Sequence, residues 1–248
     1  MYSQRPVMTK ALIAACATLL GLIPPLSETV QAAESKSVIE LFTSQGCSSC
    51  PPADEVLAIL ARKGDVIALS MPVDYWDYLG WKDTFAKPAF TARQRAYSQG
   101  RGDRQVYTPQ AVINGRQHAN GASRSEIDRA IASTVAGVDV PVRLSRRADT
   151  VMVDIGAGKV REGGVILAMS VIGQREVAIG RGENARRKVV YTNIVRDVVP
   201  LGTWSGAAQS LAIPSSVLAD SDSVVVVVQT GTEAKPGPIS GAAQLALR

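Results

Sequence analysis

Residues 37–62 read SVIELFTSQGCSSCPPADEVLAILAR. The run 37–43 has the composition of a buried strand, and apolar residues at helical spacing predict a helix over 52–62. Cys47 and Cys50 lie between these two elements. Two cysteines at this spacing can close a small disulfide loop, and a helix N-terminus lowers the pKa of a nearby thiol. The stretch therefore predicts a cysteine pair at a strand-to-helix connection.

Strand and helix patterns continue to alternate through residues 35–137. Asn114-Gly115 predicts a hairpin turn, and Asp54 and Glu55 suit the positive end of the dipole of the first helix. The order favours a mixed sheet covered by helices on both faces. The predicted elements are strands at 37–43, 66–73 and 106–113, a short strand after the hairpin turn, and helices at 52–62, around 90–98, and from Ser123 or Ser125 to about Val135.

Beyond residue 138 the helical patterns nearly vanish. Short apolar segments separated by Gly, Asp, Asn and Pro predict an antiparallel sandwich over residues 138–248. The predicted strands are 140–144, 150–155, 165–172, 176–179, 188–199, 209–213, 223–230 and 242–247, with one helical turn at 214–218.

The N-terminus has the order of a secretory signal peptide, which we predict over residues 1–32. Arg5 and Lys10 precede an apolar run from Ala11 to Ile23, and small residues follow at the expected cleavage position. The apolar run is too short to span a bilayer, which needs about 20 residues. Cys16 leaves with the signal, and no second membrane span is predicted. We therefore expect a periplasmic or secreted protein.

Composition excludes several classes of protein. The formal net charge is +5 and the charged residues are scattered, which argues against a nucleic-acid binder. The chain has one histidine, His118, and three cysteines; once Cys16 leaves with the signal, three candidate ligands remain, too few for a four-ligand Cys/His zinc site. We therefore expect no metal and no organic cofactor. His118 follows the hairpin turn and is interpreted as an exposed residue without triad partners.

The residues around the cysteine pair also carry a resemblance. Residues 41–54, 74–83 (DYWDYLGWKD), 107–115 (YTPQAVING), 182–184 and 191–196 resemble a family of exported bacterial thioredoxin-like proteins with no assigned function. That family combines a C-x-x-C motif with a C-terminal β-domain. The resemblance implies an α/β thioredoxin-like N-terminal domain over 35–137, followed by an all-β, sandwich-like C-terminal domain over 138–248. It also implies that Pro109 is a cis-proline facing the disulfide.

The combined interpretation is a thiol–disulfide oxidoreductase acting on a protein or small-molecule thiol or disulfide, with an unidentified redox partner. Cys47 is expected to be the more exposed thiol and to attack, and Cys50 to resolve the mixed disulfide. Pro109 would orient the substrate backbone, with Thr108 beside it. In residues 74–83, Trp76 would form one wall of a cleft and Asp74 would take protons from Cys50.

Two alternatives stay open at this stage. One is a non-enzymatic binding protein in which the disulfide is structural, and the other is a carrier that binds copper or zinc through the thiolates. The solvent exposure of the Cys47 sulfur discriminates between a reactive and a structural pair. Residues 180–185 satisfy G-x-G-x-x-A, but a strand-like segment follows them, so dinucleotide binding is rejected.

Overall fold

The computed structural model describes residues 1–3, 36–148, 150–159 and 163–248. Apart from its first three residues, the predicted signal peptide at 1–32 lies outside the described residues. Within those ranges no helix is long and apolar enough to cross a membrane.

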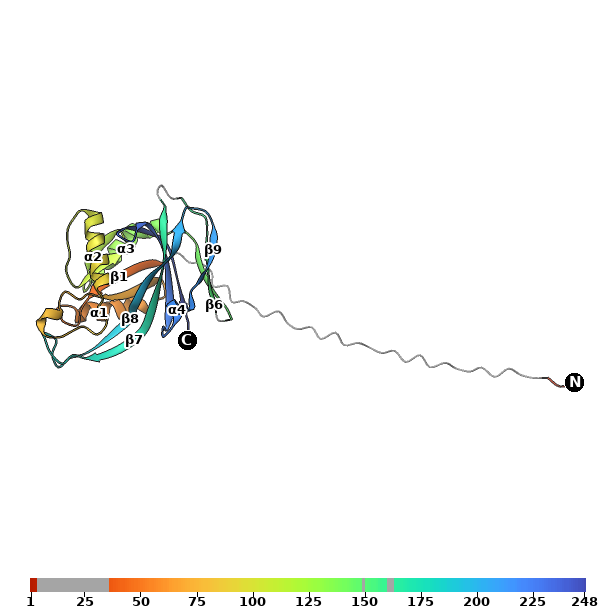
Figure 1. The fold of residues 1–248 in the computed structure, drawn as a ribbon, viewed down its shortest axis with the longest axis horizontal. Coiled ribbons are helices and arrows are strands. Elements are labelled where there is room, and N and C mark those ends of the chain that lie inside the picture. Colours follow the sequence, from red (N-terminus) through yellow and green to blue (C-terminus); the bar gives the residue numbers. More distant parts are fainter. Residues whose placement is uncertain (4–35, 149, 160–162) are drawn as a thin grey trace.

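A large mixed sheet forms the centre of the described structure (Figure 1). Its strand order is β11-β10-β7-β8-β2-β1-β3-β4, and a second, three-stranded sheet has the order β5-β6-β9. The strands of the large sheet are β1 (Ser37–Thr43), β2 (Val66–Pro72), β3 (Gln110–Ile113), β4 (Gln117–Asn120), β7 (Gly164–Ala178), β8 (Lys188–Trp204), β10 (Ser223–Thr232) and β11 (Lys235–Ala246). The small sheet consists of β5 (Val142–Arg147), β6 (Thr150–Ile155) and β9 (Gln209–Ile213).

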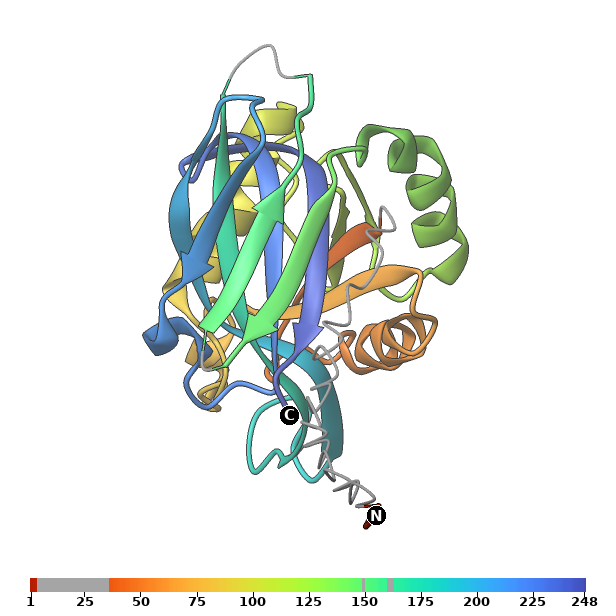
Figure 2. The ribbon, with the colours of Figure 1, turned by 90° about the vertical axis from the view of Figure 1, so that its right-hand side faces the viewer.

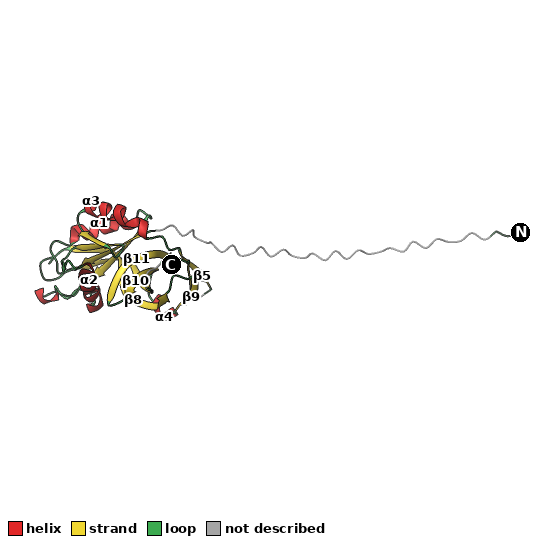
Figure 3. Cartoon of the chain, turned by 90° about the horizontal axis from the view of Figure 1, so that it is seen from above, coloured by secondary structure: helices red, strands yellow, loops and turns green. Residues whose placement is uncertain are grey.

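Both faces of the large sheet are covered around its centre, where β1, β2 and β3 are buried along their whole length. In β1, Ile39 and Leu41 belong to the apolar cluster under α1 (Pro51–Ala61) and α3 (Arg124–Thr134). Val38 and Phe42 belong instead to the cluster that contains Phe90 and Tyr97 of α2 (Pro88–Arg101). Helices α1 and α3 therefore lie on the opposite side of the sheet from α2 (Figure 3).

The small sheet covers the C-terminal part of the large one (Figure 2). Ile166 and Ala168 of β7 pack with Val153 of β6 and Ile213 of β9 in one buried cluster. The remaining helical pieces are the single turn α4 (Ser215–Leu218) and the 3-10 turns η1 (Asp77–Leu79) and η2 (Val135–Gly137).

The predicted architecture, a thioredoxin-like α/β domain followed by a separate β-sandwich, is wrong. Strand β2 pairs in parallel with β8, in register at Ser70 and Ile194, so strands from both predicted segments belong to one mainly antiparallel sheet. The physical reason is that β2 offers an unpaired edge beside β1, and β8 satisfies its hydrogen-bonding groups. Whether residues 35–137 and 138–248 fold independently of each other is not tested by the shared sheet, and the division at residues 137/138 stays a prediction.

The individual elements follow the sequence patterns much more closely than their arrangement does. Strands β1, β6 and β9 have the predicted bounds, and α3 begins after Ser123 as its N-cap. The two strands predicted at 165–172 and 176–179 are parts of the long β7. At the predicted hairpin turn Asn114 and Gly115 both have positive φ, 50° and 63°, the conformation that favours this dipeptide.

Candidate functional site

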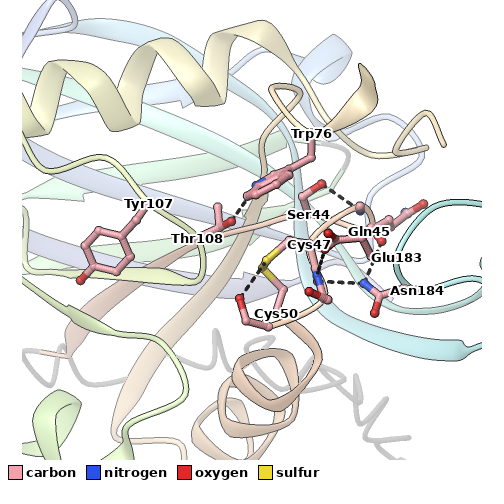
Figure 4. The surroundings of a disulfide bond; sticks show 12 residues. Ser44, Gln45, Cys47, Cys50, Trp76, Tyr107, Thr108, Glu183 and Asn184 are labelled. Carbon is pink, nitrogen blue, oxygen red and sulfur yellow. Dashed lines mark hydrogen bonds between the residues drawn. A yellow bond between two sulfur atoms is a disulfide. The ribbon is translucent and has the colours of Figure 1, made fainter. Parts of the chain in front are cut away.

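Cys47 and Cys50 form a disulfide bond between β1 and α1, with their Cα atoms 5.4 Å apart (Figure 4). Cys50 is the N-cap of α1, which begins at Pro51. The Cys47 N–H donates to the Ser44 carbonyl at 3.2 Å, and the Cys50 N–H donates to the Cys47 carbonyl at 3.2 Å. These turns hold the two cysteines within bonding distance at the strand-to-helix connection, as the spacing predicts.

Both cysteines are buried, although the residues between them are not. The exposed fraction is 1% for Cys47 and 0% for Cys50, whereas Ser48 and Ser49 are exposed. The Ser49 hydroxyl lies 3.4 Å from Cys47 Sγ. In the disulfide form the surroundings cover both residues almost completely, and the expectation that Cys47 is the more exposed thiol of the reduced pair stays a prediction.

Trp76 connects the cysteine loop with the segment before β3. Its indole N–H donates to Thr108 Oγ1 at 2.8 Å, and a Cβ on Gly46 would lie 3.0 Å from Trp76 Cβ. The Thr108–Pro109 peptide bond is cis, and Pro109 is buried. Trp76, Thr108 and the cysteine pair therefore lie close together (Figure 4).

Asp74 is directed elsewhere. The Thr91 hydroxyl donates to Asp74 Oδ1 at 2.5 Å, and the Asp74 N–H donates to Thr91 Oγ1 at 3.2 Å. These bonds join Asp74 to α2, on the opposite side of the sheet from α1. The described contacts give no support to Asp74 as the proton acceptor of Cys50.

Two other carboxyl groups lie close to the cysteine loop. Asp83 is buried and accepts backbone N–H bonds from Gln45, Phe85 and Ala86 at 2.7, 2.8 and 3.1 Å. Burial raises the pKa of Asp83 to about 6, against the lowering effect of these bonds. Gln45 is further held by Trp81, whose indole N–H donates to Gln45 Oε1 at 2.8 Å.

Asp54 lies on α1 one helical turn beyond Cys50 and is 2% exposed. Neither of its carboxyl oxygens has a hydrogen-bond partner among the described residues. Burial raises the pKa of Asp54 well above its ordinary value. The Thr43 hydroxyl opposes this rise but makes no hydrogen bond of normal geometry to the carboxyl.

The connection between β7 and β8 supplies two contacts that sequence reasoning missed. Asn184 is fully buried, and its Nδ2 donates to the carbonyls of Gln45 and Cys47 at 3.0 and 2.8 Å. The Glu183 carboxylate accepts the Ser48 N–H at 3.1 Å (Figure 4). No spacing rule brings residues 183 and 48 together. The only signal for these residues was the family resemblance over 182–184.

His118 is not the exposed, unpartnered residue that the sequence suggested. It is half-buried, with Nδ1 2.9 Å from the Tyr107 hydroxyl and Nε2 3.3 Å from Asp103 Oδ2. Burial lowers the pKa of His118. The Tyr107 hydroxyl points away from the disulfide in Figure 4, so this group is separate from the cysteine site.

No group of three or more His, Cys, Asp or Glu side chains in the described part of the chain is arranged to hold a metal ion.

A family model described as "Protein of unknown function (DUF1223)" matches residues 38–229. The chain belongs to the DUF1223 family. The matched range includes the cysteine pair, Trp76, Thr108-Pro109 and the Glu183-Asn184 contact, so the whole site lies within the family region.

Two solved structures resemble this DUF1223 chain. A crystal structure of a structural-genomics target from Agrobacterium tumefaciens is 39% identical, with a TM-score of 0.77, and the match covers 88% of this chain and 96% of that one. HBP35 of Porphyromonas gingivalis is 13% identical, with a TM-score of 0.53 and coverage of 86% and 75%, a likeness of fold alone. The search of curated proteins found no match.

Proposed function

We propose that this DUF1223 protein is a thiol–disulfide oxidoreductase that works through Cys47 and Cys50. Cys47 attacks a disulfide of a protein or small molecule, and Cys50 resolves the mixed disulfide. The observation that carries the proposal is the Cys47–Cys50 bond at the start of α1. Export through residues 1–32, to the periplasm or out of the cell, is part of the proposal.

The small size of the disulfide loop favours a reactive disulfide over a structural cross-link. The bond closes only the four residues from Cys47 to Cys50, and loop-closure entropy then contributes about 2 kcal/mol, less than for a long loop. The same loop is already held by Asn184 through two carbonyls. The fold therefore has little need of this bond as a cross-link.

The surroundings of the pair suit a polypeptide substrate. Ser48 and Ser49 are exposed, and Trp76 and Thr108 lie beside the cysteine pair on the neighbouring loops. We propose that the substrate backbone lies along Thr108 and Pro109. Because Cys47 is buried in the disulfide form, attack on it requires a displacement of the loop that contains Ser48 and Ser49.

The burial of both cysteines favours a second candidate, a non-enzymatic binding protein with a structural disulfide. An inert disulfide is covered by its surroundings, and exposed fractions of 1% and 0% are those of a covered bond.

Single-cysteine variants distinguish the two functions. If the pair is catalytic, Cys50→Ser produced with its own N-terminal segment in a bacterial host accumulates mixed disulfides on non-reducing gels, and Cys47→Ser does not. Both variants should lose at most about 2 kcal/mol of stability, measured by denaturant unfolding. Larger losses in both variants together with no trapped species would establish the structural role.

A further inference from the structure

The N-terminus of α1 offers Cys47 few hydrogen-bond donors. Free backbone N–H groups in the first turn of a helix are what stabilise a nearby thiolate. Here the first two helical positions are Pro51 and Pro52, which have no N–H. The N–H groups of Ala53 and Asp54 both donate to the Cys50 carbonyl, at 2.8 and 3.2 Å. The N–H groups of the first turn are therefore already bonded to backbone carbonyls and do not donate to Cys47 Sγ.

The Ser48 N–H, which follows Cys47 directly, is occupied as well. It donates to Glu183 Oε2 at 3.1 Å. Four covalent bonds separate this nitrogen from Cys47 Sγ, so the carboxylate lies within about 8 Å of the sulfur. A carboxylate at this distance disfavours a second negative charge on Cys47.

A group of ionisable side chains near the cysteine loop, one of which binds the Gln45 N–H, is also acidic or neutral. Asp54 comes from α1, Asp83 from the loop before α2, and Tyr191 from β8, and the three interact electrostatically. Arg181, Arg186 and Arg187 lie exposed on the same connection as Glu183. No described ion pair or hydrogen bond joins any of these arginines to residues 47–50. The Ser49 hydroxyl, 3.4 Å from Cys47 Sγ, is the neutral donor at the site.

We propose that the Cys47–Cys50 pair works as a reductant of disulfide-bonded substrates and that Glu183 sets this direction of electron flow. The inference rests on the proposed function. A poorly stabilised thiolate makes the dithiol form less stable relative to the disulfide, and the dithiol then donates electrons more readily. Glu183 acts through Ser48 and is a positioning residue, because it touches no reacting atom.

The reaction transfers two electrons to the substrate. The Cys47 thiolate attacks one sulfur of the substrate disulfide, forming a mixed disulfide and releasing the first substrate thiolate. The Cys50 thiolate then attacks Cys47 Sγ, which restores the Cys47–Cys50 bond and releases the second substrate thiolate. The two protons from the cysteines end on the two substrate thiols. A dithiol donor regenerates the reduced pair by the reverse exchange.

Equilibration with glutathione tests the proposed direction of electron flow from the cysteine pair to its substrate. The wild-type pair should stay mainly disulfide-bonded in a buffer where glutathione is mainly reduced. At a pH above the Cys47 pKa, where the thiol is ionised, Glu183→Gln should raise the equilibrium constant for reduction about threefold, which corresponds to about 14 mV, and it should lower the Cys47 pKa measured by thiolate absorbance. Pro52→Ala, which returns one N–H to the first turn, should shift both quantities in the same direction.

Glu176→Gln is the matched control, because Glu176 lies on the same hairpin and, among the described residues, its ion pair is with exposed Lys188, at 3.1 Å. It should leave the equilibrium constant unchanged. A wild-type pair that glutathione reduces readily, or a Glu183→Gln variant indistinguishable from Glu176→Gln, would overturn the inference. Trapping by Cys50→Ser reports separately on the proposed function, which survives if the pair exchanges but works as an oxidant.

Discussion

Burial favours the protonated form of Asp54. The carboxyl lies at 2% exposure without a hydrogen-bond partner among the described residues, so its ionisation in the folded protein carries a desolvation cost that the Thr43 hydroxyl offsets only in part. The unfolded chain has no such cost, and its Asp ionises at a pKa of about 4. Asp54 is therefore a source of pH-dependent stability at the base of the cysteine site.

Because the folded pKa of Asp54 is raised, its stabilising effect is complete below the unfolded pKa of about 4 and is lost as pH rises through the folded value. We expect Asp54→Asn, which cannot ionise, to gain stability relative to wild type as pH rises, at up to about 1.4 kcal/mol per pH unit. Denaturant unfolding at a series of pH values from about 4 to about 8 measures this difference.

Asp65→Asn is the control for this experiment, since Asp65 is an exposed aspartate just after α1. Its stability relative to wild type should stay constant over the same pH series. A constant difference for Asp54→Asn as well would show that the Asp54 carboxyl ionises normally in the folded protein.

At the scale of single residues, the sequence predicted only what is local or carried by the resemblance. The C-x-x-C spacing identified Cys47 and Cys50 because a bond across three positions depends on one turn of chain. Burial of Asp54 was not predictable, because its place in the first turn equally suits an exposed residue at the helix dipole. Asn184 was missed because its partners lie 137 and 139 positions away.

At the scale of elements, the connection between β7 and β8 is what holds the cysteine loop in place. We expect Asn184→Ala to remove two hydrogen bonds to buried carbonyls and to cost about 1–3 kcal/mol of stability. It should also accelerate reduction of the Cys47–Cys50 bond by dithiothreitol, because the loop that covers Cys47 is released. Samples taken at intervals and quenched by alkylation of the free thiols give the rate of disulfide reduction.

Asn193→Ala is a matched control on the same hairpin. Asn193 Nδ2 donates to the Ala68 carbonyl at 2.9 Å, so this variant loses a comparable bond away from the cysteines. It should lose stability without faster reduction. Equal rates for the two variants would mean that general loosening of the fold, and not the Asn184 contact, exposes the disulfide.

Helix α2 is joined to the sheet by a buried ion pair. Arg93 Nε lies 2.7 Å from Glu40 Oε1, the Tyr97 hydroxyl donates to Glu40 Oε2 at 2.5 Å, and Arg93 donates to Gln229 Oε1 at 3.0 Å. One network therefore links β1, α2 and β10. Each member is satisfied by the others, so removing one leaves a buried group unpaired.

We expect Arg93→Met to lose about 3–5 kcal/mol, because it leaves the fully buried Glu40 charge without its partner. The double variant Glu40→Gln/Arg93→Met should recover part of that loss. Lys87→Met breaks the exposed pair with Asp197 and should cost less than about 1 kcal/mol. Denaturant unfolding of the four proteins measures these differences, and a loss as small for Arg93→Met as for Lys87→Met would contradict the expectation.

At the scale of the whole molecule, the strand patterns predicted most elements but not the sheet they form. A strand buried on both faces, such as β2, carries no sign of which strand lies at its edge. The loss of helical patterns near residue 138 suggested a second domain. In the structure, the loss of helical patterns near residue 138 marks the point after which the chain adds mainly strands to the shared sheet. β8, from beyond this point, pairs with β2, from before it.

The contacts across the predicted boundary at residues 137/138 lead to an expectation about how the two segments fold. Leu69 and Met71 of β2 share one apolar cluster with Leu167 and Met169 of β7, and the Ile239 N–H donates to the Asn114 carbonyl at 2.9 Å. A fragment of residues 36–137 would expose that cluster and the hydrogen-bonding edge of β2, and it would lose the apolar burial that β7 and β8 provide. We expect the fragment to be largely unfolded by circular dichroism, and the chain from residue 36 to 248 to unfold in one transition whose calorimetric and van't Hoff enthalpies agree. Two results would contradict this expectation: a fragment that folds cooperatively and forms the Cys47–Cys50 bond, or two separate transitions in the longer chain. Either result would make residues 137/138 a true domain boundary, with the shared sheet assembled from two units that fold independently.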